Sequence, residues 1–325
     1  MKRLWILLLV LATGVAGAAE RSLVKLIDPS GDDDGDGTLV YPVAGDIKRG
    51  SVDLRGLDIS RDENGFWFTV TVGDFIREMW WVPGGGKNVS ARNKTNRLPF
   101  GFNIDIYVDT DRKPGSGHMF TLPGRKARID RRYAWEKAII LSPQPQTARK
   151  QLLAKLRENF PNRPPAEAEA SIDGTMYFVT RRTIRDRSIS FFVPKEFIGT
   201  SDGTDWAVTA FVTLAAPVEN DGNLGVRQFS KETLPDNLSY SGDKAPPLPI
   251  VDLLLPSGEM QARVLAAGRP LVGYSWGAHA IDEVEIDESV QTFTVRLLDL
   301  KDQREQGLIS DAEYKTLRDK ILGEL

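Results

Sequence analysis

Short stretches in which apolar and polar residues alternate run through most of the chain. Alternation with a period of two predicts β-strands that turn one face toward a core. In the second expected strand, Val52, Leu54 and Leu57 are the inward-facing residues. Strands are predicted over residues 38–43, 51–59, 65–73, 100–109, 135–141, 176–181, 188–193, 205–214 and 249–255.

The period changes between residues 143 and 159, where Leu152, Leu153 and Leu156 fall at helical spacing. We expect one inserted helix here, ended by Pro161 and the Pro164-Pro165 pair. Many short strands, few helices and a Gly- and Pro-rich loop over 217–247 favour an antiparallel arrangement. The sequence therefore predicts a mainly β fold, an antiparallel β-sandwich with an inserted helix, over residues 20–267.

The end of the chain has a different pattern. Residues 268–289 have weak periodicity and an acidic run, and are predicted to be a linker. Residues 290–325 are predicted to form an α-hairpin, whose second helix starts at the capping box Ser310-Asp311-Ala312-Glu313. So short a hairpin is unstable alone, so it must pack on the main domain or self-associate with another copy.

The first residues resemble a leader for export. Lys2 and Arg3 precede an apolar run over 4–11, and Ala16-Gly17-Ala18 is a small-residue cleavage pattern. We expect a signal peptide over 1–19 and a periplasmic or extracellular location. An uncleaved anchor is the alternative, but it needs a longer apolar span, and no later stretch approaches membrane-spanning length.

Overall composition narrows the classes of function. The chain has 325 residues, a net charge of −3 and no cysteine. The small net charge gives no overall electrostatic field that would favour nucleic acid. The absence of cysteine excludes disulfides and thiolate sites. A basic stretch over 87–132 is expected to be a solvated loop, and binding of an anionic polymer or of lipid head groups is the alternative.

The strongest chemical signal is an acidic loop over residues 28–37. Asp32, Asp34 and Asp36 occupy positions 1, 3 and 5 of a calcium-loop pattern, and Gly37 occupies position 6. Position 12 is Val43 in place of a bidentate Glu, so any further ligands must come from elsewhere in the fold. A structural Ca²⁺ is predicted, with a solvated acidic turn as the alternative. Other aspartates that could supply oxygen are Asp28, Asp46, Asp53, Asp105, Asp109, Asp111 and Asp252.

Tryptophans give a weaker signal for sugar binding. Trp80, Trp81 and Trp276 lie beside Gly or Pro and are candidates for exposed rings that stack on a sugar. Trp67 and Trp206 lie within strands and are expected in the core.

Catalysis has little support in the sequence. Only His118 and His279 are present, with no serine elbow and no zinc-binding histidine pair. Carboxylates are plentiful, but no spacing singles out a glycosidase pair, so a carboxylate-dependent hydrolase is only an alternative.

Several short motifs follow one another along residues 23–265. They are Asp28-Pro29 to Gly37, Tyr41-Pro42, Ser51-Val52-Asp53-Leu54, Ile106-Tyr107-Val108-Asp109, Pro123-Gly124-Arg125, Trp135, Phe192-Val193-Pro194-Lys195 and Val251-Asp252-Leu253-Leu254. In this order they resemble the C-terminal binding module of glucodextranase, a DOMON-like family similar to carbohydrate-binding family 9. The resemblance implies an extracytoplasmic, non-catalytic β-sandwich with calcium near the opening loop, and Asp28, Asp32 and Asp53 match its acidic positions.

Four short motifs of the final hairpin are Leu300-Lys301, the run from Gln306 to Ser310, Glu313-Tyr314 and Lys320-Ile321-Leu322. Through these motifs the hairpin resembles the short SHOCT element. This resemblance implies an association tail. The sequence thus predicts an exported binding protein for a glycan or cell-envelope polymer. A structural or assembly protein of the envelope is the main alternative.

Overall fold

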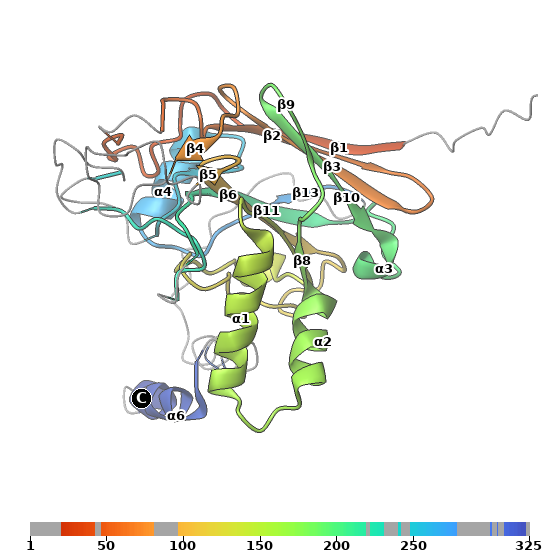
Figure 1. Ribbon diagram of the computed structural model, residues 1–325, viewed down its shortest axis with the longest axis vertical. Coiled ribbons are helices and arrows are strands. Elements are labelled where there is room, and N and C mark those ends of the chain that lie inside the picture. The colour runs from red at the N-terminus through yellow and green to blue at the C-terminus, as the bar shows by residue number, and fades with distance from the viewer. Residues whose placement is uncertain are drawn as a thin grey trace, which may run out of the picture.

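Two β-sheets packed face to face form the body of the protein (Figure 1). The structure is a computed structural model. Residues 1–20, which include the expected signal peptide, and residues 278–299 lie outside its described part. It describes residues 21–42, 47–80, 97–218, 222–230, 240–241, 248–277, 300, 304 and 309–322.

The first sheet is antiparallel throughout and, within the described residues, has five strands in the order β1-β2-β3-β10-β9. Residues along β3 and β10 alternate between buried and more exposed positions, so one face of the sheet is directed to the core and the other to solvent. The strands are β1 (Arg21–Ile27), β2 (Leu54–Arg61), β3 (Gly65–Val72), β10 (Ser188–Pro194) and β9 (Thr183–Arg185).

The second sheet has the order β12-β11-β6-β7-β8, with β13 also paired to β11, within the described part of the chain. All its pairs are antiparallel except β7–β8, which are parallel. Parallel neighbours need a long crossover, and α1 (Pro145–Asn159) and α2 (Pro165–Thr175) provide it. The strands are β12 (Asp252–Leu253), β11 (Ala207–Leu214), β6 (Phe102–Asp109), β7 (Lys137–Leu141), β8 (Met176–Phe178) and β13 (Tyr274–Ser275).

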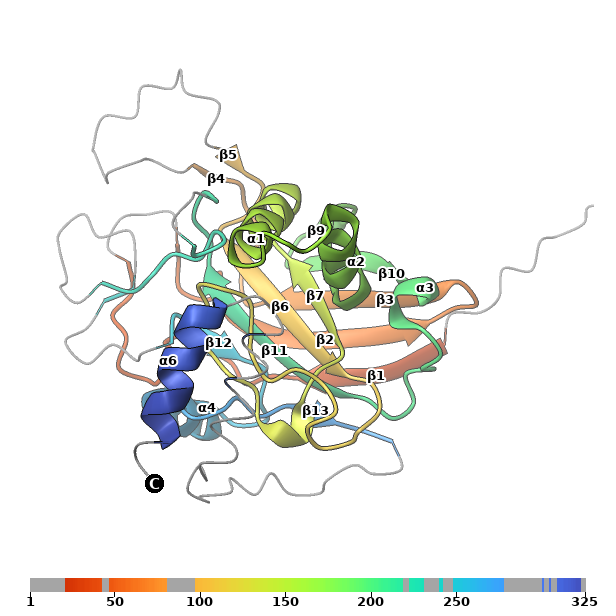
Figure 2. The ribbon, with the colours of Figure 1, turned by 90° about the horizontal axis from the view of Figure 1, so that it is seen from below.

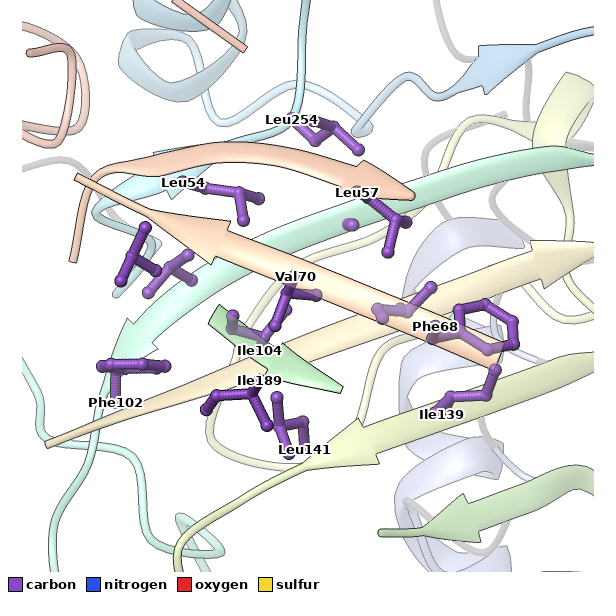
Figure 3. Packing of buried hydrophobic residues seen from close by; sticks show 14 of the residues in the cluster. Leu54, Leu57, Phe68, Val70, Phe102, Ile104, Ile139, Leu141, Ile189 and Leu254 are labelled. Carbon is purple, nitrogen blue, oxygen red and sulfur yellow. The ribbon is translucent and has the colours of Figure 1, made fainter. Parts of the chain in front are cut away.

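A continuous apolar core fills the space between the sheets. Leu57, Phe68 and Val70 of the five-stranded sheet lie opposite Ile104 and Ile139 of the six-stranded sheet (Figure 3). All five side chains are almost inaccessible to solvent. The predicted mainly β sandwich with an inserted helix is therefore confirmed.

A second core covers the outer face of the six-stranded sheet. It includes Leu152 of α1, Ile172 of α2 and Val264 of α4 (Gly258–Ala266), and Figure 2 shows α1 and α2 on this side of the sheet. The polar positions of β6 are consequently buried too. Asp105 pairs there with the fully buried Arg125, at 2.7 Å between a carboxylate oxygen and Nε.

Some elements differ from the sequence prediction. The Pro164-Pro165 pair starts a second helix, α2, because proline is well suited to the first position of a helix. Residues 38–42, where a strand was predicted, form no strand. They contain a turn residue and one isolated β-bridge, between Val40 and Ser241. Segment 268–277, expected in the linker, contributes β13 and the buried Leu271 to the sandwich. The remaining short elements are β4 (Met79–Trp80), β5 (Arg97–Leu98), α3 (Lys195–Ile198) and the 3-10 helix Arg131–Tyr133.

The capping box near the C-terminus is confirmed. Ser310 and Glu313 exchange side-chain to backbone hydrogen bonds at the start of α6 (Asp311–Leu322). Arg304 lies against α6, with its guanidinium 4.6 Å from the centre of the Tyr314 ring. The rest of the expected first helix lies outside the described residues. In the part of the chain that the structure describes, no helix is both long and apolar enough to span a membrane.

Candidate metal centre and ligand surface

Four aspartates lie together at one edge of the sandwich, two from the acidic loop and two from later parts of the chain. Asp28 directly follows β1 and Asp32 lies in the loop itself. Asp53 directly precedes β2, and Asp252 begins β12 in the opposite sheet. We call this group the carboxylate clasp.

Backbone amides fix the two most buried carboxylates of the clasp. Asp252 Oδ2 accepts a hydrogen bond of 2.5 Å from the amide of Leu54. Asp28 Oδ1 accepts one of 2.7 Å from the amide of Leu255. Each bond connects a segment of the five-stranded sheet with the β12 segment of the other sheet, so the clasp lies where the two sheets meet.

The free oxygens of the clasp converge. One carboxylate oxygen each from Asp28, Asp32 and Asp252 lie within 4.8 Å of one another. Asp28 Oδ2, Asp252 Oδ1, Asp53 Oδ1 and both oxygens of Asp32 are buried and accept no hydrogen bond from any described residue. Buried carboxylate oxygens without partners are costly, because nothing replaces the water they have lost.

Burial and mutual repulsion raise the pKa values of the clasp aspartates. Burial, followed by repulsion from Asp32 and Asp53, raises the pKa of Asp28 to about 8. Burial and the neighbouring Asp33 raise the pKa of Asp53 to about 6. Burial and Asp28 raise the pKa of Asp252 well above its ordinary value. Among the described residues, Arg55 forms an ion pair with the clasp, with its guanidinium 3.7 Å from Asp53.

These residues fit a hard divalent cation. Calcium takes six to eight oxygen ligands, and carboxylates can bind it through one or both oxygens. The convergent carboxylates of Asp28, Asp32 and Asp252 would be its ligands, and Asp53 is close enough to add to the negative potential. A bound cation would satisfy the oxygens that have no hydrogen-bond partner.

Neighbouring residues hold the loop in place. Gln261 of α4 donates its amide to the carbonyl oxygens of Asp32 and Gly35 and accepts from the amide of Leu253. Asp33 accepts hydrogen bonds from the Tyr41 hydroxyl and the Gly50 amide. The loop conformation thus depends on groups that would not themselves bind the cation.

The structure brings only some of the five predicted metal ligands together. Asp28 and Asp32 lie in the converging group, and Asp53 is beside it. Asp34 and Asp36 lie outside it, and Asp36 caps a turn by accepting hydrogen bonds from Thr38. Asp252 completes the group. Its sequence signal is an acid within the apolar run Pro249 to Leu255, a position where a carboxylate needs a partner.

The tryptophans also differ from expectation. Trp276 packs against the buried Trp206 with ring centres 6.3 Å apart, and donates its Nε1 hydrogen to the Gly203 carbonyl. The side chain of Trp80 and the whole of Trp81 lie outside the described residues. The expectation that Trp67 is a core residue is wrong, since its side chain is 39% exposed.

Trp67 belongs to a strip on the solvent face of the five-stranded sheet, which we call the β3–β10 strip. Trp67 and Phe192 are cross-strand partners with ring centres 5.2 Å apart. Hydroxyl pairs follow them along the strands, Thr69 with Ser190 at 2.9 Å and Thr71 with Ser188 at 3.1 Å. The strip therefore combines aromatic rings with a row of hydroxyl groups.

A cavity of about 430 Å³ lies just beyond the end of β3. Its lining includes Lys48, Asp74, Phe75, Arg77 and Glu78. Phe75 is 54% exposed, and Arg77 lies 3.8 Å from Asp74. The cavity is thus a second place with an exposed aromatic ring. Here the ring is close to charged groups, whereas in the β3–β10 strip it is close to hydroxyl groups.

Comparison with known proteins identifies the body of the chain. A family model, described as the C-terminal binding-module, SLH-like, of glucodextranase, matches residues 23–270. No curated protein gives a significant match. The matched residues include the carboxylate clasp, the β3–β10 strip and nearly all the described strands.

Proposed function

Because the chain belongs to the family of the C-terminal, SLH-like binding module of glucodextranase, we propose that it is an exported, non-catalytic binding protein for a glycan or cell-envelope polymer. The family is described as a binding module, which supports recognition over catalysis. The leader pattern in residues 1–19 supports export.

The β3–β10 strip is the proposed ligand surface, and the exposed ring of Trp67 is the observation that carries it. A sugar ring offers CH groups on its faces and hydroxyls on its rim. An exposed indole matches the former by packing, and hydroxyl side chains match the latter by hydrogen bonding. Antiparallel sheets in a sandwich can leave one face in water, and here the outer positions of β3 and β10 are half-buried or exposed within the described residues.

The carboxylate clasp has a structural role in this proposal. Calcium bound by Asp28, Asp32 and Asp252 would join the segment after β1 to β12, and so close the edge between the sheets. The clasp lies at the sheet edge, whereas the strip lies on the sheet face. Calcium would therefore preserve the binding surface without touching the ligand.

Polysaccharide binding tests the function directly. The full mature chain should be retained by at least one polymer from a panel of α-glucans, β-glucans and purified cell-wall polysaccharide, and should release no reducing sugar from it. Retention should be reduced by excess soluble oligosaccharide of the same polymer. The binding function would be refuted if a folded, calcium-saturated chain were retained by none of them.

A structural or assembly role is the second candidate, and the exposed face of α6 favours it. Leu317 is 40% exposed on this helix, and Arg304 lies against the Tyr314 ring. Residues 290–325 would then associate with the same segment of a second copy. Light scattering should show a lower oligomer mass when the chain is cut after Ser289, and an unchanged mass would remove the role of this segment.

A further inference from the structure

A second group of carboxylates lies at the other end of the six-stranded sheet, away from the clasp. Asp109 is the last residue of β6, and Asp111 follows it by two residues. Glu136 immediately precedes β7, and the pairing of Val108 with Lys137 places it beside Asp109. One oxygen from each of the three carboxylates lies within 4.8 Å of the others.

Asp109 is the reason to regard this group as a site. Its side chain is only 1% exposed. Oδ1 accepts hydrogen bonds from the amides of Asp111 and Arg112, but Oδ2 is buried and accepts none from the described residues. Burial, with hydrogen bonds that oppose it and the nearby Glu136 charge that adds to it, raises the pKa of Asp109 to about 6. Asp109 thus combines a buried oxygen that has no hydrogen-bond partner with two neighbouring carboxylates, and a cation would satisfy this arrangement.

The surrounding loop orients the other two carboxylates. Glu136 Oε2 accepts hydrogen bonds from the amide and hydroxyl of Thr110. The hydroxyl of Ser116 lies 2.9 Å from Asp111 Oδ1 and 3.1 Å from Glu136 Oε1. A carboxylate oxygen that accepts one hydrogen bond still has a lone pair for a metal. The group is thus held in place before any cation binds.

Among the described residues, the positive side chains of Lys113 and Arg112 both act on the site. Lys113 Nζ lies 3.3 Å from Asp111 Oδ2, but the lysine side chain is 75% exposed and so can leave at little cost. Arg112 directs its guanidinium to the carbonyl oxygen of Trp206, at 3.4 Å. Neither group provides a partner for Asp109 Oδ2.

We propose that Asp109, Asp111 and Glu136 bind a second hard divalent cation of the calcium class. The site is separate from the clasp: Asp109 pairs with Ala207 and Asp252 with Val212, which are roughly 17 Å apart along β11. Calcium here ties the end of β6 and the 110–116 turn to Glu136, the residue before β7. This proposal does not depend on the binding of a polymer.

Counting bound calcium tests the proposal. The full mature chain, freed of metal by chelator and then dialysed, is titrated with calcium chloride by calorimetry. We expect two sites per chain in the wild type, one in Glu136→Gln and one in Asp252→Asn, with none in the double variant. Circular dichroism checks that each variant folds.

The Lys113→Met variant gives an independent result that does not depend on weakening the fold. It removes the competing ammonium group, so calcium should bind the second site roughly two- to fivefold more tightly and the clasp unchanged. If the wild type bound only one calcium, and this binding were kept in Glu136→Gln but lost in Asp252→Asn, the proposal of a second site would be refuted and the clasp would stand. Loss in Glu136→Gln with no effect of Asp252→Asn would instead uphold the second site and refute the clasp.

Discussion

The carboxylate of Asp252 accepts a 2.5 Å hydrogen bond from the backbone amide of Leu54, which lies 198 residues earlier in the chain. This bond connects β12 in the six-stranded sheet to the start of β2 in the five-stranded sheet. The other oxygen of Asp252 is buried and has no hydrogen-bond partner among the described residues. One carboxylate therefore both joins the sheets and offers an oxygen to a cation.

Replacing Asp252 with asparagine separates these two roles. Asparagine keeps an oxygen for the Leu54 amide but removes one negative charge from the clasp. With calcium present, Asp252→Asn should melt at a lower temperature than the wild type, because a ligand is lost. In chelator it should melt at the same temperature or higher, because repulsion from Asp28 is removed.

Asp36→Asn is the matched control for that variant. Asp36 belongs to the same acidic loop but lies outside the converging oxygens and caps a turn. Its calcium-induced shift in melting temperature should equal that of the wild type. Equal loss of the shift in both variants would show that general loop charge, and not the clasp, attracts calcium.

The metal-free protein should become less stable as pH rises. The pKa of Asp28 is raised from 3.8 to about 8 in the folded chain, so the folded state keeps a proton that the unfolded state has lost. The folded state binds more protons between about pH 4 and about pH 8, and the free energy of unfolding falls across that range. Urea unfolding in chelator at pH 5 and pH 8 measures the difference.

Calcium should abolish that dependence, because the ion displaces the proton from the clasp. Asp28→Asn should also reduce the slope of the metal-free curve, since one titrating group is gone while Asp53 and Asp252 remain. A metal-free wild type whose stability increases from pH 5 to pH 8 would contradict the assigned acidity of Asp28.

The buried Arg125–Asp105 pair should be essential to the fold. Both side chains are about 1% exposed, and Asp105 is the only carboxylate shown to bond Arg125 within the described residues. Asp105→Asn leaves the guanidinium charge buried without a counter-ion and should cost about 3–5 kcal/mol of unfolding free energy. Chemical denaturation measures it.

Asp130→Asn provides the comparison. It breaks an ion pair with Arg132 of similar length, 2.9 Å, but at side chains that are 21% and 28% exposed. Water can solvate the remaining charge, so the loss should stay below about 1 kcal/mol. Similar losses in the two variants would show that burial of the Arg125 pair has no energetic importance.

Trp67→Ala should weaken polymer binding by about tenfold or more without changing the melting temperature by more than a few degrees. The ring is on the surface of β3, so its loss removes contact area for a ligand and opens no core cavity. Affinity electrophoresis in gels containing the retained polymer compares the variants. Phe75→Ala, at the separate cavity, is the control. Loss of binding in Phe75→Ala alone would place the ligand in the cavity.

Alternation along the chain was sufficient to predict most strands. Phe66, Phe68, Val70 and Val72 are all buried and lie on one face of β3. The same alternation places Trp67 with Thr69 and Thr71 on the opposite face. Tryptophan is usually buried, but the alternation along β3 predicts that Trp67 faces solvent. The exposure of Trp67 was therefore predictable from the sequence.

The clasp was only partly predictable. Asp28 and Asp53 lie close to the acidic loop in sequence, but Asp252 is brought to it by sheet pairing that no local pattern encodes. The regular spacing of Asp32, Asp34 and Asp36 suggested three convergent ligands. In the folded loop Gly35, between Asp34 and Asp36, adopts a φ angle of 68°, and Asp36 caps a turn at Thr38.

The melting temperature of the full mature chain in calcium and in chelator tests the clasp most directly. Calcium at about a hundred times its dissociation constant contributes about 2.7 kcal/mol, which should raise the melting temperature by roughly 5–10 °C. That rise should be smaller in Asp252→Asn, which keeps only the second site, and should persist in full in Asp36→Asn. An identical melting temperature of the wild type in calcium and in chelator would contradict a calcium clasp between the two sheets.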